Sequence, residues 1–183
     1  MKCTVLYIFV EGPDDFRFFD RIIVPLIKEK HNVPVIHIIE SAKLSKGKIR
    51  GFLQSINSVK EWDYIFVRDL NDKPCVTARK REIKNILKDV EGKIIDEGRI
   101  IVVVREIEGW YLAGLSAEDA RELKVKELPP TTDNLTKEQF NRLIPEGFYR
   151  LEFMLELLDR FSIKEARKKN RSFDYFIEKY KLC

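Results

Sequence analysis

The sequence predicts an α/β protein with a mostly parallel four-stranded sheet flanked by helices, followed by a helical appendage at the C-terminal end. Four short apolar runs, at residues 4–10, 35–39, 64–67 and 100–104, are typical of strands covered on both faces. Segments with apolar residues at helical spacing separate these runs. Because strand and helix alternate, the sheet is expected to be parallel.

The helices of the predicted core follow from their apolar spacing. The first is expected at residues 13–28, where Pro25 kinks or ends it. The second is expected at residues 46–59, with Ile49, Phe52, Leu53 and Ile56 facing inward. The third is expected to run from a cap at Thr77 to about residue 90, with Ile83, Ile86 and Leu87 as its apolar stripe.

The pattern changes after Gly109. Helices are expected at residues 110–115, 149–161 and 172–180, and a loop at residues 128–134. Thr136, with Gln139 three residues later, is typical of a capped helix start. We therefore expect a core over residues 1–115 and a helical extension over residues 116–183 that packs on it, as one domain overall.

Composition excludes several classes of protein. The 34 basic and 30 acidic residues give a net charge of +4, which permits a polyanionic partner without requiring one, and the dense charge with few glutamines resembles thermophilic proteins. Three scattered cysteines and two histidines favour neither a disulfide framework nor a zinc site. With no membrane-length apolar run and no signal-peptide pattern, we expect a cytoplasmic protein with no membrane partner.

Carboxylates follow three of the four predicted strands. They are Glu11 after the first, Asp69 and Asp72 after the third, and Glu106 and Glu108 after the fourth. In a parallel sheet these strand ends share one edge, where carboxylates repel one another unless a cation lies among them. Oxygen ligands of this kind suit Mg²⁺ or Mn²⁺.

Each cluster also has a purely structural interpretation. Residues 69–72 are typical of a surface turn, and Glu106 and Glu108 share a face only if the strand continues through them. Asp14 and Asp15 would lie in the first turn of a helix that begins at Pro13, where the helix dipole favours acidic residues. Both acidic residues therefore suit the start of a helix without any ligand.

Three motifs together resemble the topoisomerase-primase (TOPRIM) superfamily. They are Val10-Glu-Gly-Pro-Asp-Asp-Phe16, Arg68-Asp-Leu-Asn-Asp72 after a strand, and Glu106-Ile-Glu-Gly-Trp-Tyr-Leu-Ala113. Within this superfamily, the sequence is most similar to the small stand-alone proteins related to the overcoming-lysogenisation-defect nucleases. Residues Ser172 to Phe176 also resemble the Ser-Phe-x-x-Phe motif at the end of those proteins.

The resemblance implies a Rossmann-like sheet that binds magnesium and acts on nucleic acid. Glu11 would be the general acid/base or a metal ligand, Asp69 a principal ligand, Asp15 a second corner of the site, and Glu106 or Glu108 a further cluster. The usual second aspartate of the middle motif is Asn71 here. Asn71 would then be a neutral oxygen ligand, or Asp72 would replace it, and a neutral ligand weakens the hold on magnesium.

The basic runs of the sequence are where contacts to nucleic acid are expected, although such runs also occur on solvated faces. The candidate residues are Lys46, Lys48, Arg79 and Arg171.

The favoured hypothesis is a metal-dependent nuclease or phosphoryl-transfer enzyme acting on DNA or RNA. The alternative is a catalytically weak TOPRIM domain that binds nucleic acid or protein in a repair or defence system, and a third is an enzyme for small phosphate compounds. The sequence does not decide whether the substrate is DNA or RNA, whether one or two metal ions bind, or whether the protein forms homo-oligomers.

Overall fold

The computed structural model describes residues 3–88 and 95–183 of the chain. The chain divides into two compact units, of which the first comprises Met1–Val102 with Leu182 and the second comprises Val103–Lys181 with Cys183. Within the described residues, no helix is both long enough and apolar enough to span a bilayer.

The sheet is parallel throughout and has the order β2-β1-β3-β4. Its strands are β1 (Val5–Val10), β2 (Val35–Glu40), β3 (Trp62–Asp69) and β4 (Ile100–Val103). β1 lies between β2 and β3, with its first residue opposite the first residue of each. The predicted α/β class with a four-stranded sheet flanked by helices is therefore confirmed.

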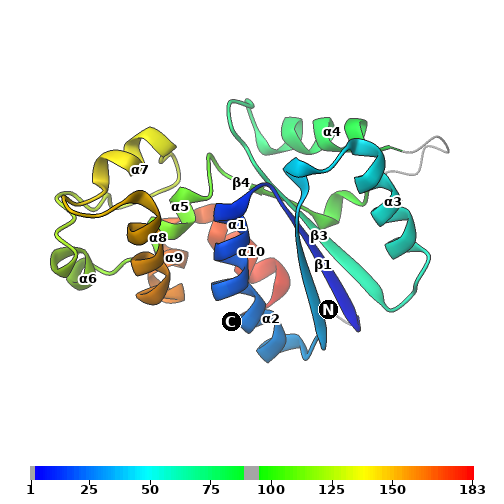
Figure 1. Ribbon diagram of the computed structural model, residues 1–183, viewed down its shortest axis with the longest axis horizontal. Helices are drawn as coiled ribbons and strands as arrows, with labels where there is room; N and C mark the ends of the chain where they lie inside the picture. Colours follow the sequence, from blue (N-terminus) through cyan, green and yellow to red (C-terminus); the bar gives the residue numbers. More distant parts are fainter. Residues whose placement is uncertain (1–2, 89–94) are drawn as a thin grey trace. The chain divides into compact units, whose positions relative to one another are not determined.

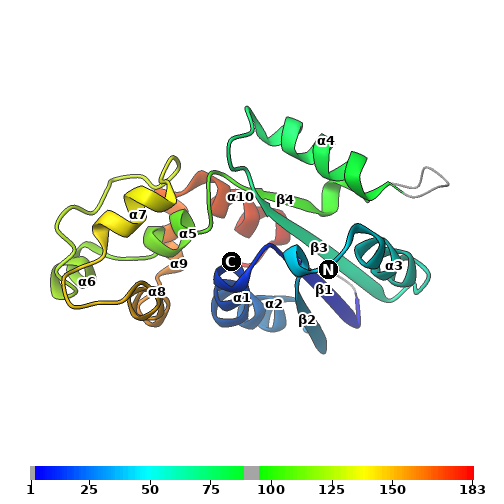
Figure 2. The ribbon, with the colours of Figure 1, turned by 45° about the horizontal axis from the view of Figure 1, so that its top comes forward.

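Helices cover both faces of this sheet. The helices of the first unit are α1 (Pro13–Phe18), α2 (Val24–His31), α3 (Lys46–Asn57) and α4 (Val76–Leu87). α1 and α2 lie beside one face, and α3 and α4 lie beside the other (Figures 1 and 2). Right-handed crossovers explain this division. Along the strand order, the connection from β1 to β2 moves one way across the sheet, and those from β2 to β3 and from β3 to β4 move the other way, so their helices lie on opposite faces.

The two central strands form the core of the first unit. Leu6, Ile8 and Phe9 of β1 have no exposed surface, and residues 64–67 of β3 are buried in the same way. β2, an edge strand, differs from the expectation of a strand covered on both faces, because Val35 is 41% exposed. β4 lies at the other edge, but all four of its residues are buried, as the sequence pattern predicts.

The predicted inward faces of α3 and α4 need one correction each. Ile49, Leu53 and Ile56 of α3 are buried, as are Ile83 and Leu87 of α4. Two further residues expected in the stripes, Phe52 and Ile86, are 40% and 37% exposed. The buried stripe is therefore narrower than the apolar one, although the ring of Phe52 packs against that of Phe9 in an edge-to-face arrangement.

Proline and threonine set helix boundaries differently from the prediction. Residues 13–31 form one helical run in which the π-helical segment Phe19–Ile23 precedes Pro25. The wider π turn accommodates a residue that lacks an N–H and whose ring crowds the preceding turn. Thr77 does not cap α4, because the helix begins at Val76 after Cys75. The expected extension of this helix over residues 89–90 lies outside the described residues.

The second unit consists of helices around a buried centre. They are α5 (Glu108–Ala113), α6 (Ala117–Glu122), α7 (Lys137–Leu143), α8 (Arg150–Asp159), α9 (Ile163–Lys169) and α10 (Arg171–Tyr180). Every residue of α5 is buried, and α5 packs against α7, α8 and α9. The unit therefore begins at Val103 and includes the segment that the sequence analysis assigned to the core up to residue 115.

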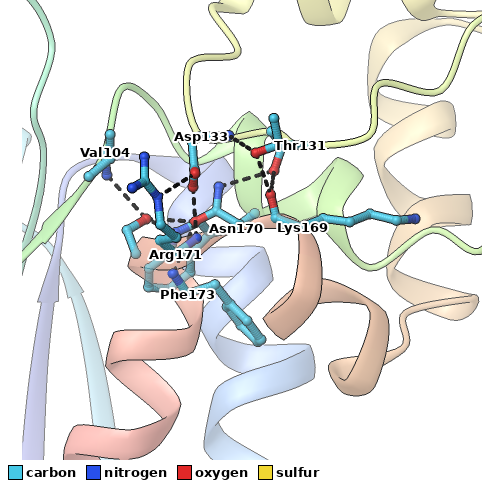
Figure 3. Close-up of polar contacts among 10 residues, drawn as sticks. Val104, Thr131, Asp133, Lys169, Asn170, Arg171 and Phe173 are labelled. Carbon is cyan, nitrogen blue, oxygen red and sulfur yellow. Dashed lines mark hydrogen bonds and ion pairs between the residues drawn. The ribbon is translucent and has the colours of Figure 1, made fainter.

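A buried polar network joins the start of α10 to the rest of the second unit (Figure 3). The hydroxyl of Ser172 accepts hydrogen bonds from the Trp110 indole (2.8 Å) and the Val104 N–H (3.3 Å), and donates one to the Asn170 side chain (2.8 Å). The amide of Asn170 in turn donates to the Thr132 hydroxyl at 3.0 Å. The Ser-Phe segment thus has a structural role, in which Ser172 and Asn170 fix the first turn of α10.

Gly114 is required by the packing of the second unit. A Cβ at this position would lie 2.2 Å from the ring of Phe161, which packs against Phe173. We expect Gly114→Ala to lower the free energy of unfolding by about 1–3 kcal/mol because the ring must move. Urea denaturation followed by circular dichroism would measure this change.

Gly51→Ala is the matched control. Gly51 lies inside α3, where an added Cβ would meet no atom within 4 Å apart from its chain neighbours and the backbone of its own helix, so the substitution should stabilise by about 0.5–1 kcal/mol. Equal effects of the two substitutions would contradict the assigned packing.

Candidate functional site

The structure has a topological switch point between β1 and β3. These neighbouring strands are parallel, but the connection after β1 crosses one face of the sheet and the connection after β3 crosses the other. In open α/β sheets, the crevice at the carboxyl ends of two such strands is where ligands bind. Glu11 and Asp69 stand at these two strand ends.

Glu11 and Asp69 are in direct contact. Glu11 immediately follows β1, and its Oε2 accepts a hydrogen bond from the Asp69 backbone N–H at 3.3 Å. Asp69 is the last residue of β3, and the Glu11 side chain is 34% exposed. The structure therefore brings the Glu11 carboxylate to the main chain of Asp69, at the edge of the sheet where the sequence analysis placed both residues.

Asp15, expected in the site, lies at the start of α1 and caps it. Asp15 is buried, and its Oδ2 accepts from the Gly12 N–H at 3.1 Å, so it caps the first turn of α1. Asp14 instead forms an ion pair with Arg17 on the outside of the same turn. Asp15 still contributes negative charge to the site, because it acts electrostatically on Arg68.

Arg68 is a largely buried cation at this edge, and the sequence analysis did not assign it to the site. Its guanidinium donates to the Val67 carbonyl (2.7 Å) and the Ser41 hydroxyl (2.6 Å), and lies over the ring of Phe66 at 4.1 Å. Burial lowers the pKa of Arg68 to about 10, while the carboxylate of Glu11 opposes that shift. The side chain therefore remains positively charged at neutral pH.

Arg79, at the start of α4, is the second cation beside these carboxylates. Its Nε donates to the Asp69 carbonyl and its Nη1 to Glu82 Oε2, both at 2.9 Å. Its Nη2 lies 3.8 Å from Glu11 Oε2. Arg79 was expected to contact nucleic acid as part of a basic run, and the structure places it in contact with Glu11 itself.

Asn71 and Asp72 form the turn after β3. Asn71 has a φ of 49°, and the Lys73 N–H donates to the Leu70 carbonyl at 3.2 Å. Asparagine adopts this left-handed conformation more readily than most residues, which gives Asn71 a structural reason independent of any ligand role. Asp72 is exposed, as the surface-turn interpretation predicts.

Glu106 and Glu108 have partners within the second unit. Glu106 Oε2 accepts from the backbone N–H of Lys137 at 2.5 Å, at the start of α7. Glu108 is buried, and its Oε1 pairs with Arg150 at 2.6 Å. Burial raises the pKa of Glu108 above 4.5, against the lowering effect of Arg150. Both carboxylates thus take part in contacts that organise this unit.

The remaining basic candidates differ in their surroundings. Lys46 and Lys48 are exposed in the first turn of α3. Arg171 pairs with Asp133 through its backbone N–H and its Nε, each at 2.7 Å, although its side chain is 89% exposed. Arg171 therefore also holds the loop before α7 (Figure 3).

The switch point offers a divalent cation few protein ligands. Over residues 3–88 and 95–183, no three acidic, histidine or cysteine side chains gather into a metal-binding group. Mg²⁺, however, commonly uses only one or two protein carboxylates and completes its shell with water and substrate phosphate. Glu11 and Asp69 match that smaller donor set.

No protein-family model matches the chain, and no curated protein or solved structure matches it. The resemblance to the TOPRIM superfamily consequently stays a prediction from the sequence motifs.

Glu108 should make stability depend on pH. Because its pKa is raised in the folded protein, the folded state holds a proton that the unfolded state has released above pH 4.5. The stability from protonated Glu108 is present below pH 4.5 and is lost as the pH rises through the raised pKa. Glu108→Gln should flatten this part of the stability curve.

Urea denaturation at a series of pH values from about 4 to 7 would measure this difference. The matched control is Glu146→Gln, at an exposed position of the same unit, which should leave the curve unchanged. Parallel curves for wild type and Glu108→Gln would contradict the assignment.

Proposed function

We propose that this protein is a Mg²⁺- or Mn²⁺-dependent enzyme that cleaves or transfers phosphodiester bonds in DNA or RNA. The observation that carries the proposal is the meeting of Glu11 and Asp69 at the switch point of the sheet. The motif resemblance to TOPRIM nucleases, which covers these same residues, supports it independently.

Glu11 and Asp69 would hold the cation, with the rest of its shell left to water and substrate. A bound Mg²⁺ would polarise the phosphodiester and lower the pKa of a bound water. Before it binds, Glu11, Asp15 and Asp69 act electrostatically on Arg68, and Arg79 lies 3.8 Å from Glu11. A divalent cation would add two positive charges beside these groups and favour an anionic substrate.

The chain's own residues supply the other parts of the chemistry. One carboxylate oxygen of Glu11, Oε2, is oriented by the Asp69 N–H, and the second oxygen would accept a proton from the attacking water. Arg68 provides a fixed positive charge, held by Val67 and Ser41, toward which negative charge on phosphate can develop. Asp15, buried at the start of α1, keeps the Gly12 turn in place beside Glu11.

Isosteric substitutions test this proposal. Glu11→Gln and Asp69→Asn keep the side-chain shape but remove the negative charge, and each should lower cleavage by about a hundredfold or more. The assay is cleavage of single- and double-stranded DNA and RNA with Mg²⁺ or Mn²⁺.

Asp20→Asn, at an exposed position in the π-helical segment, should cleave like wild type. Absence of cleavage by wild type on every substrate, or equal cleavage by wild type and Glu11→Gln, would refute an enzymatic role.

One observation favours a second function, that of a catalytically weak domain that binds nucleic acid or protein. Arg79 already compensates Glu11, and Asn71 stands where a second aspartate is usual. A domain of this kind would bind an oligonucleotide equally well with EDTA or with Mg²⁺. Fluorescence anisotropy under both conditions separates the two functions, and competition by inorganic phosphate instead of polynucleotide would point to a small phosphate compound.

A further inference from the structure

Arg79 contacts oxygen atoms from three separate segments of the first unit. They are the main-chain carbonyl of Asp69 at the end of β3, the carboxylate of Glu82 one turn later in α4, and the carboxylate of Glu11 after β1. Its side chain is only 14% exposed. The guanidinium is therefore held beside the Glu11 carboxylate and against the main chain of Asp69.

These three contacts are unequal. The bonds from Nε to the Asp69 carbonyl and from Nη1 to Glu82 are 2.9 Å long and have the length of good hydrogen bonds. The 3.8 Å separation between Nη2 and Glu11 Oε2 exceeds that length, so it is an ion pair without a hydrogen bond. The Glu11 contact can therefore be exchanged while the other two hold the guanidinium in position.

Glu82 is suited to anchor Arg79 when the contact with Glu11 is lost. Its second oxygen pairs with Lys73 at 3.0 Å, and the hydrogen bonds from Arg79 and Lys73 lower the pKa of its carboxyl group. Glu82 is thus ionised at neutral pH and keeps a charged partner for Arg79 that is independent of Glu11.

Arg68 shows a different arrangement. Its bonds go to the Val67 carbonyl and the Ser41 hydroxyl, and Ser41 itself donates to the Val10 carbonyl at 2.6 Å. Neither partner of Arg68 is a carboxylate of the site. A cation binding to Glu11 would therefore compete with Arg79 directly and would leave the hydrogen bonds of Arg68 unchanged.

We propose that Arg79 exchanges Glu11 for the substrate phosphate when the metal binds. Without metal, Arg79 is the counter-ion of Glu11. Once a divalent cation takes the Glu11 carboxylate, the Nη2 group is released and donates to a phosphate oxygen, while Asp69 and Glu82 keep the guanidinium at the site. This inference rests on the proposed function, and it makes metal and substrate bind cooperatively, because each favours the same state of Arg79.

The test compares Arg79→Gln with wild type in two measurements. Calorimetric titration with Mn²⁺ alone should show tighter binding to Arg79→Gln, by about twofold to tenfold, because a competing positive charge is removed. Oligonucleotide cleavage at saturating Mn²⁺ should show a raised KM, because a phosphate contact is lost. Arg79→Lys keeps the charge but cannot hold Asp69 and Glu82 together, so its Mn²⁺ affinity should stay near wild type while KM rises.

Arg81→Gln is the matched control, since Arg81 is exposed two residues later in α4. It should change neither measurement, and thermal unfolding of all variants checks that they fold.

The outcomes separate this inference from the function beneath it. If wild type binds Mn²⁺ and cleaves, but Arg79→Gln binds the metal no more tightly or keeps its KM, the exchange is refuted and the enzyme remains. If wild type does not bind Mn²⁺, both are refuted.

Discussion

The parallel pairing of β1 with β3 is the constraint on which the rest of the structure depends. Because both strands are interior and apolar, they fix the order of the sheet, and right-handed crossovers then send α1 and α4 to opposite faces. The same pairing brings the carboxyl ends of two strands that are distant in sequence to one point. Glu11 and Asp69, 58 residues apart, meet there without any segment dedicated to joining them.

The acidic residues of the candidate site could be predicted from the sequence, whereas the contacts of the arginines that balance their charge could not. Glu11 and Asp69 were identified because each lies at the carboxyl end of a buried strand, and the carboxyl ends of parallel strands share one edge of the sheet. Arg79 was named from a basic run, but its contact with Glu11 could not be predicted, since nothing in that run distinguishes it from the exposed Arg81 two residues later. Arg68 left one signal, a cation directly before the aspartate of a strand-end motif, which is unusual in a buried strand.

The fold could be predicted where the apolar residues have a strong periodicity. It was harder to predict where an element is only one or two helical turns long. The four strands and the capped helix after Thr136 follow from apolar runs and capping chemistry. The short helices α6 and α9 were not predicted, although Ser116 and Ser162 each cap one of them and an acidic residue follows three positions later. The exposure of Phe52 depends on how closely α3 approaches the sheet, which no local pattern encodes.

Each compact unit contains one of the two tryptophans of the chain. Trp62 lies partly exposed at the start of β3, where its ring is 5.4 Å from that of Tyr7, whereas Trp110 is fully buried with its indole bonded to Ser172. Their emission spectra should therefore differ, since one indole is in contact with solvent and the other lies in a buried, hydrogen-bonded interior. Replacing either with phenylalanine would leave a single intrinsic fluorophore, so that the loss of structure in each unit could be followed separately.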